Sequence, residues 1–196
     1  MAFESKKNNV TEQLCATVKL PKMVRVRQSF DPTHIEPADL PAVVRGELLR
    51  EAVRQNIKPG MSIGITCGSR GINHNAVMAR AIVDFVKSKG AEPYIVAAMG
   101  SHGGATAEGQ RGILTSYGIT EETMGCPIIS SMETVKIGHA DEIDVDVQID
   151  KNAYEADGII VLNRIKAHTG FKGKYESGLM KMMTVGLGKQ AGAYVA

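Results

Sequence analysis

From residue 61 onward, the chain alternates apolar strand patterns with amphipathic helix patterns, and this order restricts the folds open to it. Met61–Cys67 is an apolar strand pattern, and Asn75–Lys89 then repeats apolar residues at helical spacing. A second strand pattern covers Pro93–Met99, a weaker helix pattern covers Thr106–Tyr117, and the apolar run Gly158–Leu162 is typical of a buried parallel strand. This alternation predicts an α/β domain of the three-layer, Rossmann-like kind with a mostly parallel sheet.

Two further strands and a last helix complete the predicted domain. Pro127–Ser131 is a short apolar segment, and Ile143–Ile149 alternates apolar and polar residues with the period of a strand. The last helix is expected from about Ser177 to Leu187, where apolar residues again recur at helical spacing.

The first 58 residues follow a different pattern. Residues 11–30 alternate loosely between apolar and polar, which predicts one or two short strands interrupted at Pro21. An amphipathic helix is expected over Leu40–Asn56. We therefore divide the chain into an N-terminal segment of strand, loop and helix, residues 1–58, and a Rossmann-like domain, residues 59–196.

Composition excludes several classes of partner. The formal net charge is only +2 and aromatic residues make up 5% of the chain, whereas nucleic-acid-binding domains usually carry a strongly basic surface. No segment is apolar for long enough to span a membrane, and the polar N-terminus lacks the apolar core of a secretory signal. The three cysteines are scattered, as is typical of reduced thiols. We expect a cytoplasmic protein with no nucleic acid or membrane partner.

Three predicted strands each end in a loop with a polar side chain of the kind that performs chemistry. Arg70 lies in Gly-Ser-Arg-Gly after the first strand, His102 lies in Gly-Ser-His-Gly-Gly after the second, and His168 ends the loop after the Gly158–Leu162 strand. Ligands of open parallel sheets bind outside the carboxyl ends of the strands. The three loops therefore predict a site for a small anionic substrate with two candidate proton-transfer groups.

Each of these residues also has a plainer interpretation. His102 is compatible with a polar residue in a flexible turn, and Arg70 with a solvated side chain between turn glycines. Lys181 points away from the apolar stripe of the last helix, so it is either an ordinary surface lysine or a lysine that faces the site. It closes a basic segment with a single acid, Glu176, whose five cations are Arg164, Lys166, Lys172, Lys174 and Lys181. Such a cluster favours phosphate or carboxylate groups or, alternatively, forms a solvated face.

No metal site is predicted. The histidines, at positions 34, 74, 102, 139 and 168, lack metal-ligand spacing, and no cysteine lies near a histidine in an ordered motif.

Several short strings resemble the nickel-dependent lactate racemase family, and in particular its uncharacterised homologues. They occur in the same order over roughly residues 60–196: Gly-Ser-Arg-Gly-Ile at 68–72, Ala-Met-Gly-Ser-His-Gly-Gly-Ala at 98–105, Asn-Arg-Ile-Lys-Ala-His-Thr at 163–169, Glu-Ser-Gly-Leu-Met-Lys at 176–181 and Gly-Leu-Gly-Lys-Gln at 186–190. In that family an N-terminal Rossmann-like domain packs against a C-terminal domain, with the active site between them.

The resemblance implies a racemase or epimerase of 2-hydroxy acids, an isomerase that uses a nickel-pincer nucleotide joined covalently to a lysine. The cofactor takes hydride from the α-carbon while a histidine removes the hydroxyl proton, and hydride then returns to the opposite face. By this resemblance the catalytic residues are His102 and His168, the cofactor-binding residues are Lys181, Ser177 and Gly178, and the residues that bind the anionic substrate are Arg70, Ser69 and Lys166.

The chain departs from the family at three places, one of which is the spacing from His168 to Lys181, about three residues longer than in lactate racemases. The family's Asp-His-Thr-Arg-Pro string is replaced by Cys67-Gly68-Ser69-Arg70-Gly71, which loses an acidic residue. The resemblance also places the nickel-binding histidine and the C-terminal domain beyond Ala196. We therefore expect a fragment that is inactive alone and lacks the cofactor carried by the full-length protein.

Two other functions remain open from the residues. One is a binding module for a phosphorylated or carboxylated small molecule, without turnover. The other is acid–base chemistry at the α-proton by His102 and His168 without nickel, which would demand strong enolate stabilisation.

Overall fold

The chain forms two compact units, residues 1–34 and residues 35–196. The computed structural model describes residues 10–16, 18–19, 21–69, 71–170 and 172–195. In the first unit the described residues form one helix, α1 (Val10–Cys15), and no strand. The strands predicted within residues 11–30 are therefore absent from the described part of this unit. An isolated strand without a partner leaves its backbone hydrogen-bonding groups unpaired, so alternation alone does not produce one.

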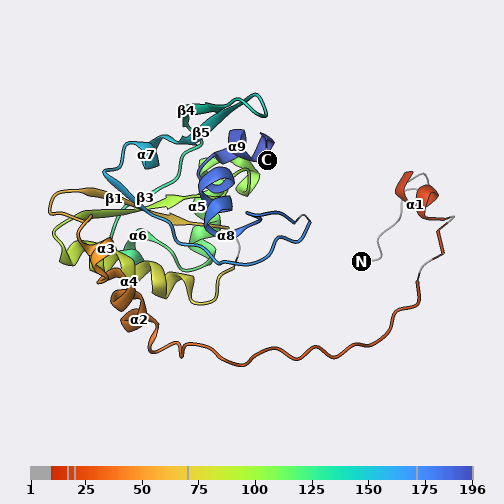
Figure 1. Cartoon of the computed structure of the whole chain (residues 1–196), viewed down its shortest axis with the longest axis horizontal. Helices are drawn as coiled ribbons and strands as arrows, with labels where there is room; N and C mark the ends of the chain where they lie inside the picture. Colours follow the sequence, from red (N-terminus) through yellow and green to blue (C-terminus); the bar gives the residue numbers. More distant parts are fainter. Residues whose placement is uncertain (1–9, 17, 20, 70, 171, 196) are drawn as a thin grey trace. The chain divides into compact units, whose positions relative to one another are not determined.

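Strands and helices alternate along the second unit (Figure 1). Its strands are β1 (Ser62–Cys67), β2 (Glu92–Ala97), β3 (Ile128–Ile129), β4 (Thr134–Ala140), β5 (Val145–Asp150) and β6 (Gly158–Ile160). Its α-helices are α2 (Leu40–Leu48), α3 (Glu51–Arg54), α4 (Asn75–Ser88), α5 (Ala107–Ser116), α6 (Glu121–Met124), α7 (Lys151–Tyr154), α8 (Gly178–Lys181) and α9 (Lys189–Val195). A π-helical turn, Met182–Gly186, follows α8 directly.

The central sheet has the strand order β3-β2-β1-β6, and every pairing in it is parallel. Ile65 of β1 lies opposite Ile95 of β2 on one side and Ile160 of β6 on the other. The pairing with β6 continues beyond the strand, because the backbone N–H of Leu162 donates to Oγ1 of Thr66 at 3.0 Å. The strand that was predicted to be buried, β6, is only half-buried.

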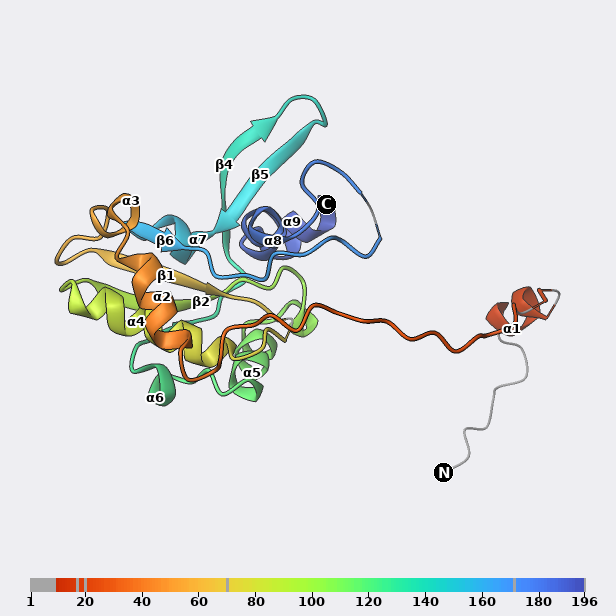
Figure 2. The ribbon, with the colours of Figure 1, turned by 60° about the horizontal axis from the view of Figure 1, so that its bottom comes forward.

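Alternate residues of the strands face two separate cores, which gives the domain its three layers. Ile63, Ile65 and Ile95 pack with buried residues of α4, α5 and α6 on one face. On the other face, Val96 and Ala98 pack with Ala153 of α7 and with Met182 and Leu187. Figure 2 shows α4 and α6 on one side of the sheet and α7, α8 and α9 on the other. The predicted three-layer, Rossmann-like α/β fold with a parallel sheet is confirmed.

A two-stranded antiparallel hairpin, β4–β5, stands outside the main sheet. The predicted strand at Ile143–Ile149 corresponds to β5, whereas β4 was not predicted. Its pairing shifts register between Lys136 and Gly138, so a bulge interrupts the alternation there. No described helix of either unit is both long and apolar enough to cross a membrane.

Two predicted helices differ at their ends for local reasons. The helix predicted over Leu40–Asn56 is broken into α2 and α3, because Arg50 has an extended backbone conformation between them. The last predicted helix continues past Leu187 as α9, after the π-helical turn. At the start of α5, Oγ1 of Thr106 caps the helix by accepting a hydrogen bond from the Gly109 N–H at 3.0 Å.

Candidate active site

The strand order of the sheet has a switch point at the carboxyl ends of β1 and β6. From β1 the chain proceeds to β2 and then β3 in one direction, whereas β6 pairs with the opposite side of β1. The connections α4 and α5 cover one face, and α7 covers the other. Open α/β sheets bind ligands at such a switch point. The loops that follow β1, β2 and β6 are the three loops singled out in the sequence.

The first two loops are joined by a hydrogen bond between Oγ of Ser69 and Nδ1 of His102. The backbone carbonyl of Ser69 in turn accepts from the hydroxyl of Tyr117 at 2.6 Å. Ser69 is half-buried and His102 is exposed. The structure therefore brings together two of the predicted residues, one from each loop, and fixes one nitrogen of the His102 ring.

The third loop brings together a second pair of predicted residues, His168 and Lys181. Nε2 of His168 lies 3.1 Å from Nζ of Lys181, which is the last residue of α8. Nδ1 of the same ring accepts a hydrogen bond from the backbone N–H of Gly170 at 3.0 Å. Both ring nitrogens of His168 thus have defined neighbours.

These two contacts indicate which nitrogen of the neutral His168 ring carries the proton. Because Nδ1 accepts from Gly170, the neutral ring holds its proton on Nε2, the nitrogen that lies 3.1 Å from Nζ of Lys181. The pKa of His168 is lowered from 6.5 by desolvation, then by the positive charges of Lys181 and Lys166, with Glu176 acting in the opposite direction. The site therefore favours an uncharged imidazole at neutral pH.

Glu176 closes the loop that carries His168. Its carboxylate accepts from the backbone N–H of His168 at 3.0 Å and from that of Gly173 at 3.1 Å. These hydrogen bonds lower the pKa of Glu176 below 4.5. No role was predicted for Glu176, whose only signal in the sequence is that it is the one acid in a basic segment.

Ser177 and Gly178 connect this loop to α8. Ser177 occupies the N-cap position of α8 without a side-chain capping bond, and Gly178 is buried with a φ of +68°. The carbonyl of Gly178 accepts from Nδ2 of Asn163 at 2.7 Å, which ties the start of the loop to its end. The left-handed backbone conformation favours glycine at position 178.

A pocket of about 460 Å³ opens beside the second pair. Its polar wall includes His168, Lys181 and Glu176, and its other lining residues are Tyr175, Met180, Thr184, Val185 and Ala193. The His102 loop packs against two of these lining residues. A Cβ at Gly100 would lie 3.1 Å from Cγ1 of Val185 and 3.4 Å from Cβ of Ala193. Pockets of this volume are in the range that binds small ligands.

The comparisons with known proteins give one match. Residues 56–194 match a family described as "Domain of unknown function (DUF362)". The chain belongs to the DUF362 family. No curated protein and no solved structure matches it.

Of the predicted residues, Ser69, His102 and Lys166 do not line the 460 Å³ pocket, and Arg70 cannot be placed. Lys166 is exposed, with Nζ 3.5 Å from the carbonyl of Ala167, and acts on His168 through its charge. Arg70 lies outside the described residues. Among those that are described, no group of three or more His, Cys, Asp or Glu side chains could hold a metal ion.

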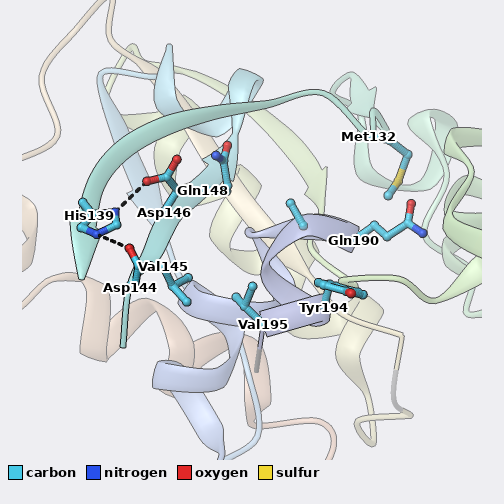
Figure 3. Close-up of a pocket in the computed structure, with 10 residues that line it drawn as sticks. Met132, His139, Asp144, Val145, Asp146, Gln148, Gln190, Tyr194 and Val195 are labelled. Atoms are coloured by element: carbon cyan, nitrogen blue, oxygen red, sulfur yellow. Dashed lines mark hydrogen bonds and ion pairs between the residues drawn. The ribbon is translucent and has the colours of Figure 1, made fainter. Parts of the chain in front are cut away.

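A larger hollow of about 790 Å³ lies between the hairpin and α9 (Figure 3). His139 on its hairpin wall places Nδ1 2.8 Å from Oδ1 of Asp146 and Nε2 3.3 Å from Oδ1 of Asp144. Gln190 and Tyr194 of α9 line it from the opposite side. His139 therefore braces the hairpin near its turn and belongs to neither histidine pair of the candidate site.

Proposed function

We propose that this DUF362 domain supplies the acid–base residues and the cofactor lysine of a racemase or epimerase that acts on 2-hydroxy acids. The observation that carries the proposal is the contact between His168 and Lys181 on the wall of a pocket at the carboxyl edge of the sheet. A histidine held uncharged beside a lysine amine unites a proton-transfer group with a nucleophilic amine.

The residues present fit a nickel-pincer nucleotide attached to Lys181. The side chain of Lys181 is exposed, lines the pocket and places Nζ 3.1 Å from Nε2 of His168, so the amine is accessible to a group bound in the pocket. When bound, this group supplies a hydride acceptor for the α-carbon of the substrate. Ser177 and Gly178 would hold it indirectly, since they set the start of the short helix that ends at Lys181.

The two histidines have opposite roles in transferring the hydroxyl proton: one accepts a proton and the other donates one. In the direction in which His168 gives up a proton, it starts as the imidazolium, donates from Nε2 and ends as the neutral ring. At His102, a Ser69 hydroxyl that accepts from Nδ1–H leaves the lone pair on Nε2, which makes this ring the proton acceptor. In the reverse direction of the reaction the roles exchange.

The charge around the pocket suits an anionic substrate. Four exposed cations lie in the loop that carries His168 and precedes α8, and their positive charge attracts a carboxylate without a buried partner. They are Arg164, Lys166, Lys172 and Lys174. This field supports binding of a 2-hydroxy acid through its carboxylate.

The test is a racemisation assay on the full-length protein, produced with the enzymes that build the cofactor, using a panel of enantiopure 2-hydroxy acids and chiral chromatography. His168→Gln keeps an acceptor for the Gly170 N–H but removes the titrating ring. We expect kcat to fall by about 10²- to 10⁴-fold, the usual contribution of a general acid–base group. The matched control is His34→Gln, which removes an exposed histidine of the first unit and leaves kcat unchanged.

Two results would contradict the proposal. One is wild-type protein that binds 2-hydroxy acids but inverts none of them, which would identify a binding module. The other is equal turnover by wild type and His168→Gln.

A further inference from the structure

A fully buried lysine, Lys189, lies behind the candidate site at the start of α9. Its side chain has 0% exposure, and its backbone has a φ of +54°, a left-handed conformation that is uncommon for a residue with a side chain. Burial lowers the pKa of Lys189, and the nearby carboxylate of Asp150 opposes that shift. Neither the proposed chemistry nor the resemblance assigns this residue a role.

Three oxygen atoms from different parts of the fold converge on Nζ of Lys189. Oδ2 of Asp150 lies 3.0 Å away, Oε1 of Gln110 lies 3.3 Å away, and the carbonyl of Ala97 accepts a further hydrogen bond. Asp150 ends β5, Gln110 belongs to α5, and Ala97 ends β2. A buried ion pair is often replaceable by apolar residues at little or no loss of stability, so stability alone does not require a lysine here.

The side-chain amide of Gln110 connects Lys189 to the His102 loop by hydrogen bonds on both of its sides. Its Oε1 faces Lys189, so its Nε2 is directed to the opposite side, where it donates to the carbonyl of Gly100 at 2.8 Å and to that of His102 at 3.2 Å. Gln110 is itself fully buried. An amide fixed on both sides has one orientation, and this orientation sets the position of the His102 backbone.

The same loop is attached to the wall of the pocket. The N–H of Gly100 donates to the carbonyl of Gly186 at 3.1 Å, in the π-helical turn that follows Lys181. A Cβ at Gly100 would lie 3.1 Å from the carbonyl oxygen of Val185, which lines the pocket with His168. The His102 loop is thus held between Gln110 on one side and the pocket wall on the other.

We propose that Lys189 and Gln110 are positioning residues: they hold His102 in register with the pocket wall that carries His168 and Lys181. This inference rests on the proposed function for its catalytic meaning, but the positioning itself is a structural property. Displacement of a catalytic group by about 1 Å can lower turnover by about a hundredfold, so a relay of this kind matters for the reaction.

The experiment compares Gln110→Met with wild type and with Gln190→Met, which makes the same change at an exposed residue next to Lys189. Ring nitrogens of ¹⁵N-histidine-labelled protein are observed by NMR across a pH titration. In Gln110→Met we expect the His102 signals to move toward those of an averaged pair of tautomers, as the Ser69 bond loosens. The His139 signals stay in place, and Gln190→Met leaves His102 unchanged.

A second variant tests the same proposal independently, in case Gln110→Met does not fold. Lys189→Met combined with Asp150→Asn removes both charges of the pair, keeps an acceptor for the Ala153 N–H that Asp150 caps, and leaves Gln110 in place. We expect it to shift the His102 signals in the same direction. A folded Gln110→Met or double variant whose His102 titration matches wild type would overturn the proposal.

Kinetics on the full-length, cofactor-loaded protein separates this proposal from the proposed function. Gln110→Met should lower kcat at least about tenfold with KM within about twofold, because substrate contacts remain while a proton-transfer group moves. If the wild type inverts no 2-hydroxy acid, the proposed function fails, yet the NMR comparison still decides whether Gln110 positions His102.

Discussion

Nε2 of His168 lies 3.1 Å from Nζ of Lys181, although the two residues belong to different elements, a loop and the helix that follows it. The opposite nitrogen of the same ring accepts from Gly170. The ring therefore links a backbone N–H of its own loop to the side chain at the end of α8. The bond from Gly170 sets the tautomer of His168, and the contact with Lys181 places a positive charge beside the ring.

Removing the charge of Lys181 should raise the pKa of His168. Lys181 is the leading charge that lowers this pKa, ahead of Lys166, so Lys181→Met should produce a larger upward shift than Lys166→Met. Lys174→Met, at an exposed lysine of the same loop, serves as the control and should leave the titration unchanged. The measurement is an NMR titration of the His168 ring protons. Equal titration curves for wild type and Lys181→Met would show that the contact is absent in solution.

The loop that carries His168 should loosen in acid. The pKa of Glu176 is lowered by its backbone hydrogen bonds, so the ordering they provide is complete above 4.5, the ordinary value, and is lost as the pH falls through the lower folded-state value. Glu176→Gln should speed amide exchange at His168 and Gly173 already at neutral pH, whereas the exposed Glu122→Gln should not. Unchanged exchange in Glu176→Gln would remove its role in closing the loop.

A close approach of two glycines should make α5 intolerant of one added methyl group. A Cβ at Gly109 would lie 1.9 Å from the carbonyl oxygen of Gly103, whereas a Cβ at Gly112 of the same helix meets nothing within 4 Å. We expect Gly109→Ala to lower the free energy of unfolding by about 1–3 kcal/mol, the usual effect of overpacking. Gly112→Ala should instead raise it by about 0.5–1 kcal/mol through helix propensity. Urea denaturation of the two variants checks this, and equal stabilities would contradict the packing described.

The three cysteines should differ sharply in reactivity. Cys15 is exposed, while Cys67 and Cys126 are buried. Burial raises the pKa of Cys67 from 9.0 to about 12 and also raises that of Cys126, so neither supplies much thiolate at pH 8. Native protein should release one equivalent of thionitrobenzoate rapidly from Ellman's reagent, and the Cys15→Ser variant none on that timescale. Rapid reaction of a second thiol would show that the core opens readily.

Much of the fold was predictable because strands buried on both faces and amphipathic helices leave strong patterns in sequence. The three polar loops were found for the same reason, since each begins where an apolar strand ends. The pairing of Ser69 with His102 and of His168 with Lys181 was beyond reach, because it depends on the strand order and on side-chain directions within the loops.

Other features left little trace in the sequence. Lys189 looks like any lysine of a helix, and only the three-dimensional convergence of Asp150 and Gln110 distinguishes it. The bulge before Gly138 interrupts the alternation by which β4 could have been predicted. The strands predicted near Pro21 do not form because alternation alone cannot provide a partner strand. Long-range partners, rather than local preference, decide each of these cases.

The most direct test of the proposed function is the mass of the full-length protein after co-expression with the enzymes that build the nickel-pincer nucleotide. We predict a mass increase that peptide mapping assigns to Lys181 and that is absent in Lys181→Arg. A lactate racemase produced in the same cells confirms that the cofactor is made. An unmodified Lys181 beside a fully loaded racemase would contradict the account and leave the pocket of His168 to a different ligand.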